Sequence, residues 1–315
     1  LGPPLGGIVT HTAGWRWIFI LSAAAGFIAF ELARRRLPEE QPAKERKGLD
    51  IGGAALYGIA VVLVMHGFTL LPTPLGILET AAGCVCAAGF VMHERRIPNP
   101  VLDVGMLTGN RTFALSNVAA FINYASTTGV GFFISLYLQH VKGLNARDAG
   151  LVMVIQPVFM TVLSPLAGRM SDRMVPGRIA SAGMAMTVIA LVSLSFLDAD
   201  TGIWVAGTIL AVLGCSFALF SSPNTNAVMS AVGSGQLGAA SGILGAMRVL
   251  GQTMSMGMAT MVLAHGLGHT AVGPGNIPRF VNAMQATFLS FAGLCAIGTI
   301  ASWTRARGSL TGRGT

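Results

Sequence analysis

Charged residues are scarce in this sequence. Only 10% of its 315 residues are charged and 53% are apolar, whereas soluble domains carry about a quarter charged residues. Too few polar side chains remain to cover the apolar surface of a water-soluble protein of this size. The composition therefore excludes an ordinary soluble domain and indicates a chain that lies in lipid.

The sequence also lacks the patterns on which enzymes and metal sites are built. It contains no nucleophile elbow, phosphate-binding loop or zinc signature. His265 and His269 stand four residues apart, but no third ligand accompanies them. The cysteines lie inside apolar runs without metal-site spacing, and we interpret them as packing residues: Cys84, Cys86, Cys215 and Cys295. We expect no enzyme activity, no cofactor and no metal.

The net charge of +8 has two possible explanations: the chain binds nucleic acid, or its basic residues set the topology of membrane spans. The basic residues fall in short segments between apolar runs, which is how membrane topology is encoded. We therefore expect a lipid bilayer as the partner, and no nucleic acid.

Apolar runs of the length that a membrane span needs, about 20 residues, recur along the whole chain. We predict a helix for each, because backbone groups in lipid must hydrogen-bond within their own segment. The nine runs are Trp17–Ala33, Ile51–Leu71, Leu75–Met92, Phe113–Leu138, Ala149–Ala167, Ile179–Leu197, Ile203–Phe220, Leu237–Leu263 and Val281–Trp303. Residues 1–10 resemble the end of a tenth, and we expect the chain to begin inside an element, as a fragment would.

Lys and Arg predict the orientation of these spans. Fifteen of the 20 lie in the segments 34–50, 93–112, 168–178 and 304–315, and only four lie in the alternate connections. The positive-inside rule places the first set, and with it the C-terminus, in the cytoplasm. The uncharged connection Ser221–Gln236 does not contribute to this argument.

Two polar, proline-containing segments divide the chain. Residues 34–50 and 93–112 are predicted cytoplasmic linkers, and they isolate a transmembrane hairpin, 51–92, that turns at Pro72-Thr73-Pro74. Six successive spans follow in 113–303, before a predicted cytoplasmic tail, 304–315. We predict that these six spans form one C-terminal helical bundle.

Two motifs resemble those of the major facilitator superfamily, in its fourteen-helix drug:proton antiporter branch. The opening Gly2-Pro3-Pro4-Leu5-Gly6-Gly7 resembles the end of the antiporter motif, and Gly14-Trp15-Arg16-Trp17 follows as is typical of that branch. The segment Gly168-Arg169-Met170-Ser171-Asp172-Arg173, then Gly177-Arg178, resembles the cytoplasmic signature loop in its second-half copy. Pro176 and a spacing one residue longer depart from the tidiest form of that loop.

The resemblance implies an all-α, polytopic bundle of the major facilitator fold. Residues 1–33 would end the N-terminal bundle, and the nine runs would be helices six to fourteen after a partial helix five. It also implies that helices one to four, with the acidic residues linked to proton coupling, are missing from an N-terminally truncated chain. Gly2, Pro3, Gly6 and Gly7 would seal the interface between the two halves, with plain packing as the alternative.

Arg248 is the strongest single candidate for a functional residue, because it lies near the middle of its predicted span. A central Arg costs at least about 2.5 kcal/mol on insertion scales and therefore needs water or a partner. Ser241, Gly245, Arg248 and Gln252 share one helix face, so Arg248 should point into the bundle. We predict that Arg248 contacts substrate or a coupling carboxylate. The alternative is that it anchors helix ends through backbone carbonyls.

Other polar residues in the spans are candidates for lining a cavity. Asn117 and Tyr124 share a face with Asn123 beside it, and Gln156 precedes Pro157, where a kink would free carbonyls. The alternative is hydrogen bonding between helices. Gly238, Gly242 and Ala246 predict close helix packing.

The signature segment suggests a conformational latch. Asp172 would pair with an Arg (Arg169, Arg173 or Arg178) or with a helix N-terminus, and the contact would break as the transporter changes face. The alternative is a set of charges that only fixes topology.

These expectations combine into a secondary transporter of the plasma membrane. The resemblance implies export of drugs or hydrophobic metabolites by alternating access, driven by the proton gradient without a cofactor. A transporter for another small metabolite and a non-transporting membrane remnant stay as alternatives. The sequence predicts neither the substrate nor the oligomeric state.

Overall fold

The computed structural model describes residues 9, 14–36, 50–97, 104–268, 272–273 and 275–311, and these residues form helices and no strand. The expected all-helical fold is thereby confirmed. Gly2, Pro3, Gly6 and Gly7 lie outside the described part.

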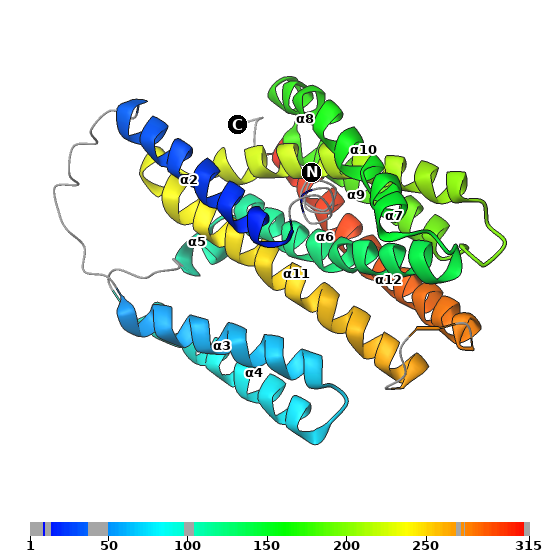
Figure 1. Cartoon of the computed structure of the whole chain (residues 1–315). Coiled ribbons are helices and arrows are strands. Elements are labelled where there is room, and N and C mark those ends of the chain that lie inside the picture. Colours follow the sequence, from blue (N-terminus) through cyan, green and yellow to red (C-terminus); the bar gives the residue numbers. More distant parts are fainter. Residues whose placement is uncertain are drawn as a thin grey trace.

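Three helices precede the main bundle, and each matches a predicted run within a few residues. They are α2 (Arg16–Arg36), α3 (Ile51–Leu70) and α4 (Pro74–Glu94). No residue of α2 is buried, and it lies at one side of the molecule (Figure 1). The Asp50 side chain caps α3 by accepting the Gly53 N–H, and Thr73 caps α4 in the same way at Gly76.

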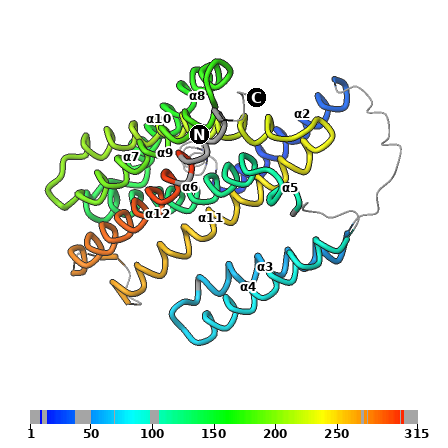
Figure 2. Tube along the Cα trace, turned by 180° about the vertical axis from the view of Figure 1, so that it is seen from behind, coloured from blue at the N-terminus to red at the C-terminus, as the bar shows by residue number. Residues whose placement is uncertain are grey.

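The α3–α4 hairpin packs tightly because glycines face the partner helix. A Cβ on Gly83 would lie 2.8 Å from the backbone nitrogen of Val64, so no larger residue fits without a shift. The hairpin lies beside α11 in both views (Figures 1 and 2), and Phe68 of α3 packs on Gly257 of α11.

The main bundle follows a short helix, α5 (Val104–Gly109), that the sequence did not predict. Its helices are α6 (Arg111–Leu136, extended by a π turn at Tyr137–Val141), α7 (Ala146–Met153), α8 (Ile155–Arg173), α9 (Pro176–Leu194), α10 (Ile203–Met229), α11 (Leu237–Leu267) and α12 (Ile277–Thr311). The helix breaks at Val154, three residues before Pro157, so the predicted Pro157 kink separates α7 from α8.

Within the described residues, eight helices are long and apolar enough to cross a membrane, with α7 and α8 counted as one. The remaining predicted run, Leu237–Leu263, corresponds to the 31-residue helix α11. This helix is long enough to cross a membrane but is not among the eight. Its Arg248, Gln252 and small polar residues lower its mean hydropathy. Nine full spans therefore remain a prediction.

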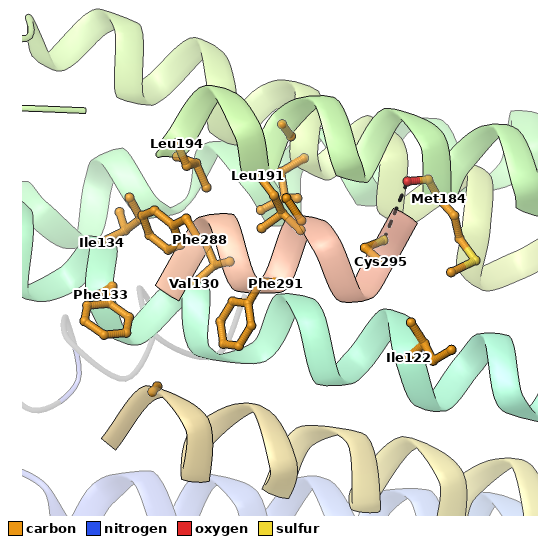
Figure 3. Packing of buried hydrophobic residues seen from close by; sticks show 14 of the residues in the cluster. Ile122, Val130, Phe133, Ile134, Met184, Leu191, Leu194, Phe288, Phe291 and Cys295 are labelled. Carbon is orange, nitrogen blue, oxygen red and sulfur yellow. Dashed lines mark hydrogen bonds between the residues drawn. The ribbon is translucent and has the colours of Figure 1, made fainter. Parts of the chain in front are cut away.

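The core of the bundle lies where α6, α9 and α12 meet. Phe133 of α6 contacts Phe288 of α12 with ring centroids 5.9 Å apart, and both are fully buried (Figure 3). The Cys295 thiol on α12 donates to the Met184 carbonyl of α9 at 3.7 Å. The described part of the chain thus has one continuous hydrophobic core that holds α6 at its centre.

Two helices continue beyond the apolar runs that were predicted as spans, and both for the same reason. The run Ile203–Phe220 was ended where hydropathy falls, but α10 continues to Met229, so most of the predicted connection Ser221–Gln236 is helix. Likewise α12 continues beyond Trp303 to Thr311, into the predicted tail. A fall in hydropathy marks polar side chains, which a helix tolerates where they face a neighbour or water.

Candidate functional site

A polar cavity of about 500 Å³ lies between α8, α10 and α11. Small-molecule sites commonly measure about 300–1,000 Å³. The lining residues are Ser164, Gly168, Ser171 and Asp172 from α8, Ser221, Ser222, Thr225, Asn226 and Met229 from α10, and Arg248 from α11. Nine of these ten carry a hydroxyl, an amide, a charge or no side chain at all, which sets the cavity apart from the apolar helices around it.

The hydroxyls of the cavity are held by their own helices. Ser164 Oγ donates to the Met160 carbonyl, Ser171 Oγ to the Gly168 carbonyl and Thr225 Oγ1 to the Ser221 carbonyl, each within 2.8 Å. A hydroxyl bonded one turn back satisfies its proton and keeps oxygen lone pairs for another donor. These three hydroxyls therefore offer acceptor oxygens to the cavity.

Arg248 is the cationic group in the lining of this cavity. Its Nη2 donates to Thr225 Oγ1 at 2.7 Å, and its guanidinium lies 5.7 Å from the centre of the Tyr124 ring on α6. Its Nε is buried without a hydrogen-bond partner. No ion pair within the described residues includes Arg248. The contacts join α6, α10 and α11 through side chains and not through the helix-end carbonyls of the alternative interpretation.

Tyr124 is held in place by a second aromatic ring. Phe217 of α10 meets it edge to face at 5.4 Å between centroids, with an interplanar angle of 82°. Such a pair contributes about 0.5–1.5 kcal/mol beyond its buried area. Tyr124 and Arg248 are thus the two predicted substrate or coupling candidates that the structure brings together.

The signature segment is mostly helix and not loop. Gly168, Arg169, Asp172 and Arg173 belong to the last turns of α8, and only Met174 and Val175 separate it from α9. Arg169, Arg173 and Arg178 are exposed, whereas Gly177 is buried at the start of α9. The predicted loop is wrong because the chain turns within two residues.

The partner of Asp172 differs from the one expected. Within the described residues Asp172 forms no ion pair; its Oδ1 lies 3.4 Å from the Asn226 amide, which also donates to Ser171 Oγ at 3.0 Å. The expected pairing with an Arg or a helix N-terminus is not formed among the described residues of this conformation, and the latch stays a prediction. Asn226 is a neutral link between the ends of α8 and α10.

Asn117 and Asn123 do not line the cavity. Both are fully buried in α6, and the Asn117 amide donates to the Phe113 carbonyl at 3.0 Å. Both polar atoms of the Asn123 side chain lack a hydrogen-bond partner among the described residues. The sequence prediction fails because α10, α11 and α12 all pack on α6, which leaves these two side chains no open face.

Gln156 and Gln252 also lie apart from the cavity lining. Gln156 is half-buried beside the break between α7 and α8, where a Cβ on Gly214 of α10 would meet its carbonyl. Gln252 is exposed one turn beyond Arg248 on α11. Neither contributes to the cavity in this conformation.

Sequence reasoning missed the α10 residues that form most of the lining. Ser221, Ser222, Thr225 and Asn226 were assigned to a connection because their stretch is polar. The stretch Ser-Ser-Pro-Asn-Thr-Asn contains no charged residue, and this composition could have indicated that it continues the helix.

Long apolar helices around a polar cavity are typical of multi-pass membrane transporters. A family model supports the same class: the model of the Major Facilitator Superfamily matches residues 1–256 and 118–313. The chain belongs to the Major Facilitator Superfamily.

The curated relatives are named either as a transporter of a metabolite or as drug-resistance proteins. The riboflavin transporter RibZ of Clostridioides difficile is 26% identical over 302 residues, which cover 95% of this chain and 65% of RibZ. The multidrug resistance protein Stp of Mycobacterium tuberculosis is 28% identical over 278 residues, covering 85% and 50%. The methylenomycin A resistance protein of Streptomyces coelicolor is 27% identical over 270 residues, covering 84% and 56%. This chain thus spans about half to two thirds of the length of these relatives.

A solved structure supports the fold alone. The crystal structure of the nucleoside transporter NupG aligns with a TM-score of 0.51 and 15% identity, over 81% of this chain and 65% of NupG. The helices are therefore arranged as in a transporter of known structure.

Proposed function

We propose that this chain forms part of a proton-coupled exporter of drugs or hydrophobic metabolites that works by alternating access. The observation that carries the proposal is the 500 Å³ polar cavity with Arg248 in its wall. A central Arg is costly in lipid and is kept where it serves substrate or ion passage. The resistance proteins among the relatives favour drugs as the cargo.

The expected mechanism is the rocking of two helical bundles around a site near the middle of the membrane. Inward movement of one proton across 100 mV supplies about 2.3 kcal/mol, before any pH gradient is added. In this mechanism Arg248 holds the substrate or the coupling carboxylate, with Tyr124 and Thr225 fixing its direction. Asn226 joins the ends of α8 and α10 and gives way when the cavity changes face.

One relative favours a second candidate cargo. RibZ is named a riboflavin transporter, and the acceptor-rich lining described here suits a polar metabolite. Under this alternative the same cavity carries a polar small molecule in place of a hydrophobic drug.

The test uses the complete open reading frame that encodes this chain, expressed in a host without its own efflux pumps. For the exporter, we expect raised tolerance of dyes and antibiotics and faster efflux when a proton gradient is applied. Arg248→Met should lower the efflux rate about tenfold or more, as expected for the loss of a charge-assisted hydrogen bond of about 1.5–3 kcal/mol. Arg279→Met removes an exposed Arg at the start of α12 and is the matched control.

Two results would contradict the proposal. Unchanged tolerance together with uptake of riboflavin or another metabolite would exclude drug export. Equal efflux by Arg248→Met and Arg279→Met would show that the cavity is not the path.

A further inference from the structure

The positive charge of Arg248 is not balanced by an ion pair within the described residues. The ion pairs in this part of the chain lie on α2 or in the α3–α4 hairpin, away from the α8–α10–α11 cavity. Arg248 is half-buried. A charged group that is partly removed from water is costly unless an opposite charge or hydrogen bonds replace its hydration. The cavity lining therefore holds a cation that needs a negative partner.

The guanidinium of Arg248 keeps a hydrogen-bond donor that the described residues do not use. Nη2 donates to Thr225 Oγ1, whereas Nε is buried and no described residue accepts its proton. Thr225 Oγ1 is bound to act as the acceptor here, because it donates its own proton to the Ser221 carbonyl. The N–H groups of arginine form a rigid fork that matches the two oxygens of a carboxylate. The Nε side of Arg248 is thus suited to an oxyanion.

The direction of the guanidinium is fixed before any ligand binds. Thr225 holds Nη2 from α10, and the Tyr124 ring of α6 lies 5.7 Å from the guanidinium carbon. Phe217 in turn packs against Tyr124. A donor that is already oriented loses little conformational freedom on binding, and this raises the affinity for a ligand of matching shape.

Asp172 is the other charged residue of the lining, and it does not neutralise Arg248. It is exposed at the end of α8, and its Oδ1 lies 3.4 Å from the Asn226 amide. Water and salt screen an exposed charge far more than a partly buried one. The electrostatics of the cavity are therefore dominated by the half-buried Arg248, and they favour a ligand whose negative charge lies beside it.

We propose that the cargo of this cavity carries an anionic group, a carboxylate or a similar oxyanion, that binds Arg248 through Nε. The inference rests on the proposed function, because it takes the cavity as the transport path, and it applies to a drug and to a metabolite alike. A volume of about 500 Å³ leaves room for the rest of a small organic anion. A cationic or uncharged cargo would leave the charge of Arg248 unbalanced.

The same oxyanion chemistry could come from a second source, a carboxylate on a part of the protein that lies outside this chain. The two sources differ in one measurable respect. If a protein carboxylate pairs with Arg248, the complete protein should not distinguish an anionic ligand from a neutral one of the same shape. If the anion belongs to the cargo, the complete protein should retain that distinction.

Binding of two matched probes tests the proposal. The probes are 2-naphthoate and 2-naphthamide, which share one aromatic body and differ in the negative charge. Their fluorescence anisotropy is measured with this chain and with the product of the complete open reading frame, each in lipid nanodiscs. We expect both proteins to bind the naphthoate at least about tenfold more tightly, as charge-assisted hydrogen bonds predict. Arg248→Met should abolish the difference, and the exposed Arg279→Met is the matched control that should retain it.

Three results would overturn the proposal. They are equal or absent binding of the two probes by the wild-type chain, a preference for naphthoate that survives in Arg248→Met, and a preference that the chain shows but the complete protein lacks. If Arg248→Met does not fold, Arg248→Lys takes its place. This variant keeps the charge without the fork, so it should weaken naphthoate binding and leave naphthamide binding unchanged. Dye efflux tests the proposed function separately, so a transporter without anion preference is distinguished from a chain that does not transport.

Discussion

Gly251 marks a close approach of α11 to α6. A Cβ there would lie 2.5 Å from the Phe121 carbonyl oxygen and 3.0 Å from the Ala125 nitrogen, both of them backbone atoms of α6. Backbone atoms cannot move aside as the end of a side chain can. The two helices must therefore separate if this residue becomes larger.

We predict that Gly251→Ala lowers the free energy of unfolding by about 1–3 kcal/mol, as overpacking usually does. Gly245→Ala is the matched control on the same helix, since a Cβ there meets no atom within 4 Å. The control should be neutral or stabilising by up to about 1 kcal/mol, because Ala favours helix over Gly. Thermal unfolding in detergent measures both, and equal destabilisation by the two variants would contradict the assignment.

The sequence indicated that glycines of α11 pack closely, but among the described residues other glycines than the predicted ones make the close contacts. Gly238 and Gly242 belong to the predicted stripe, yet a Cβ on either would meet no atom within 4 Å. Gly251 and Gly257 make the close approaches instead. Spacing identifies residues that share a face, whereas the position of the neighbouring helix decides which face is covered.

Among the described residues, the main contact between the α3–α4 hairpin and the bundle is that of α3 with α11. Phe68 lies against Gly257 of α11, where a Cβ would be 2.7 Å from the Phe68 Cβ. This contact lies near the turn of the hairpin, while Asp50 and Glu94 join the two helices at the other end. The hairpin thus contacts α11 near its turn, and its two helices are in contact with each other at the opposite end.

We predict that Phe68→Cys and Gly257→Cys together form a disulfide under mild oxidation, in a background without the four native cysteines. Disulfides need Cβ atoms about 3.5–4.5 Å apart, which a small shift of the two helices provides. Phe68→Cys with Gly245→Cys is the control, because Gly245 faces open space. Comparable cross-linking in both pairs, read as a mobility shift on a gel, would refute this docking point.

At the scale of elements, hydropathy predicted the helices better than their ends. Ile51–Leu71 and Leu75–Met92 differ from α3 and α4 by at most two residues at each end, since Asp50, Thr73 and Pro74 are strong local signals for a helix start. The predicted end of α10, Phe220, was nine residues too early, because the last turns of this helix are polar and line the cavity. A functional surface inside a helix weakens the signal that would reveal the helix.

The orientation of the whole molecule is a prediction from the distribution of Lys and Arg. Arg173 at the end of α8 and Asp200 between α9 and α10 lie at opposite ends of α9, and both are exposed. The positive-inside rule puts Arg173 in the cytoplasm and Asp200 outside.

We expect an impermeant maleimide to label the Asp200→Cys variant in intact cells, again without the native cysteines. The Arg173→Cys variant should react only after the cells are opened. Reaction of both variants in intact cells, or the reverse order, would contradict the orientation.

The sequence by itself determined that this chain is helical and lies in lipid. The surplus of apolar over charged residues and the repeat of runs of about 20 are local properties, and a span must satisfy its own backbone hydrogen bonds. It also singled out Arg248, because an isolated charge in an apolar run is visible without a structure.

Only the tertiary structure decided which residues meet. It buried Asn117 and Asn123 in α6, set Tyr124 against Arg248, lined the cavity with α10, and brought Glu94 to Asp50 across 44 positions of sequence. Helical periodicity states which side chains share a face, but the partner of that face depends on how distant helices pack. The sites of this protein lie between helices, and for that reason the sequence alone could not place them.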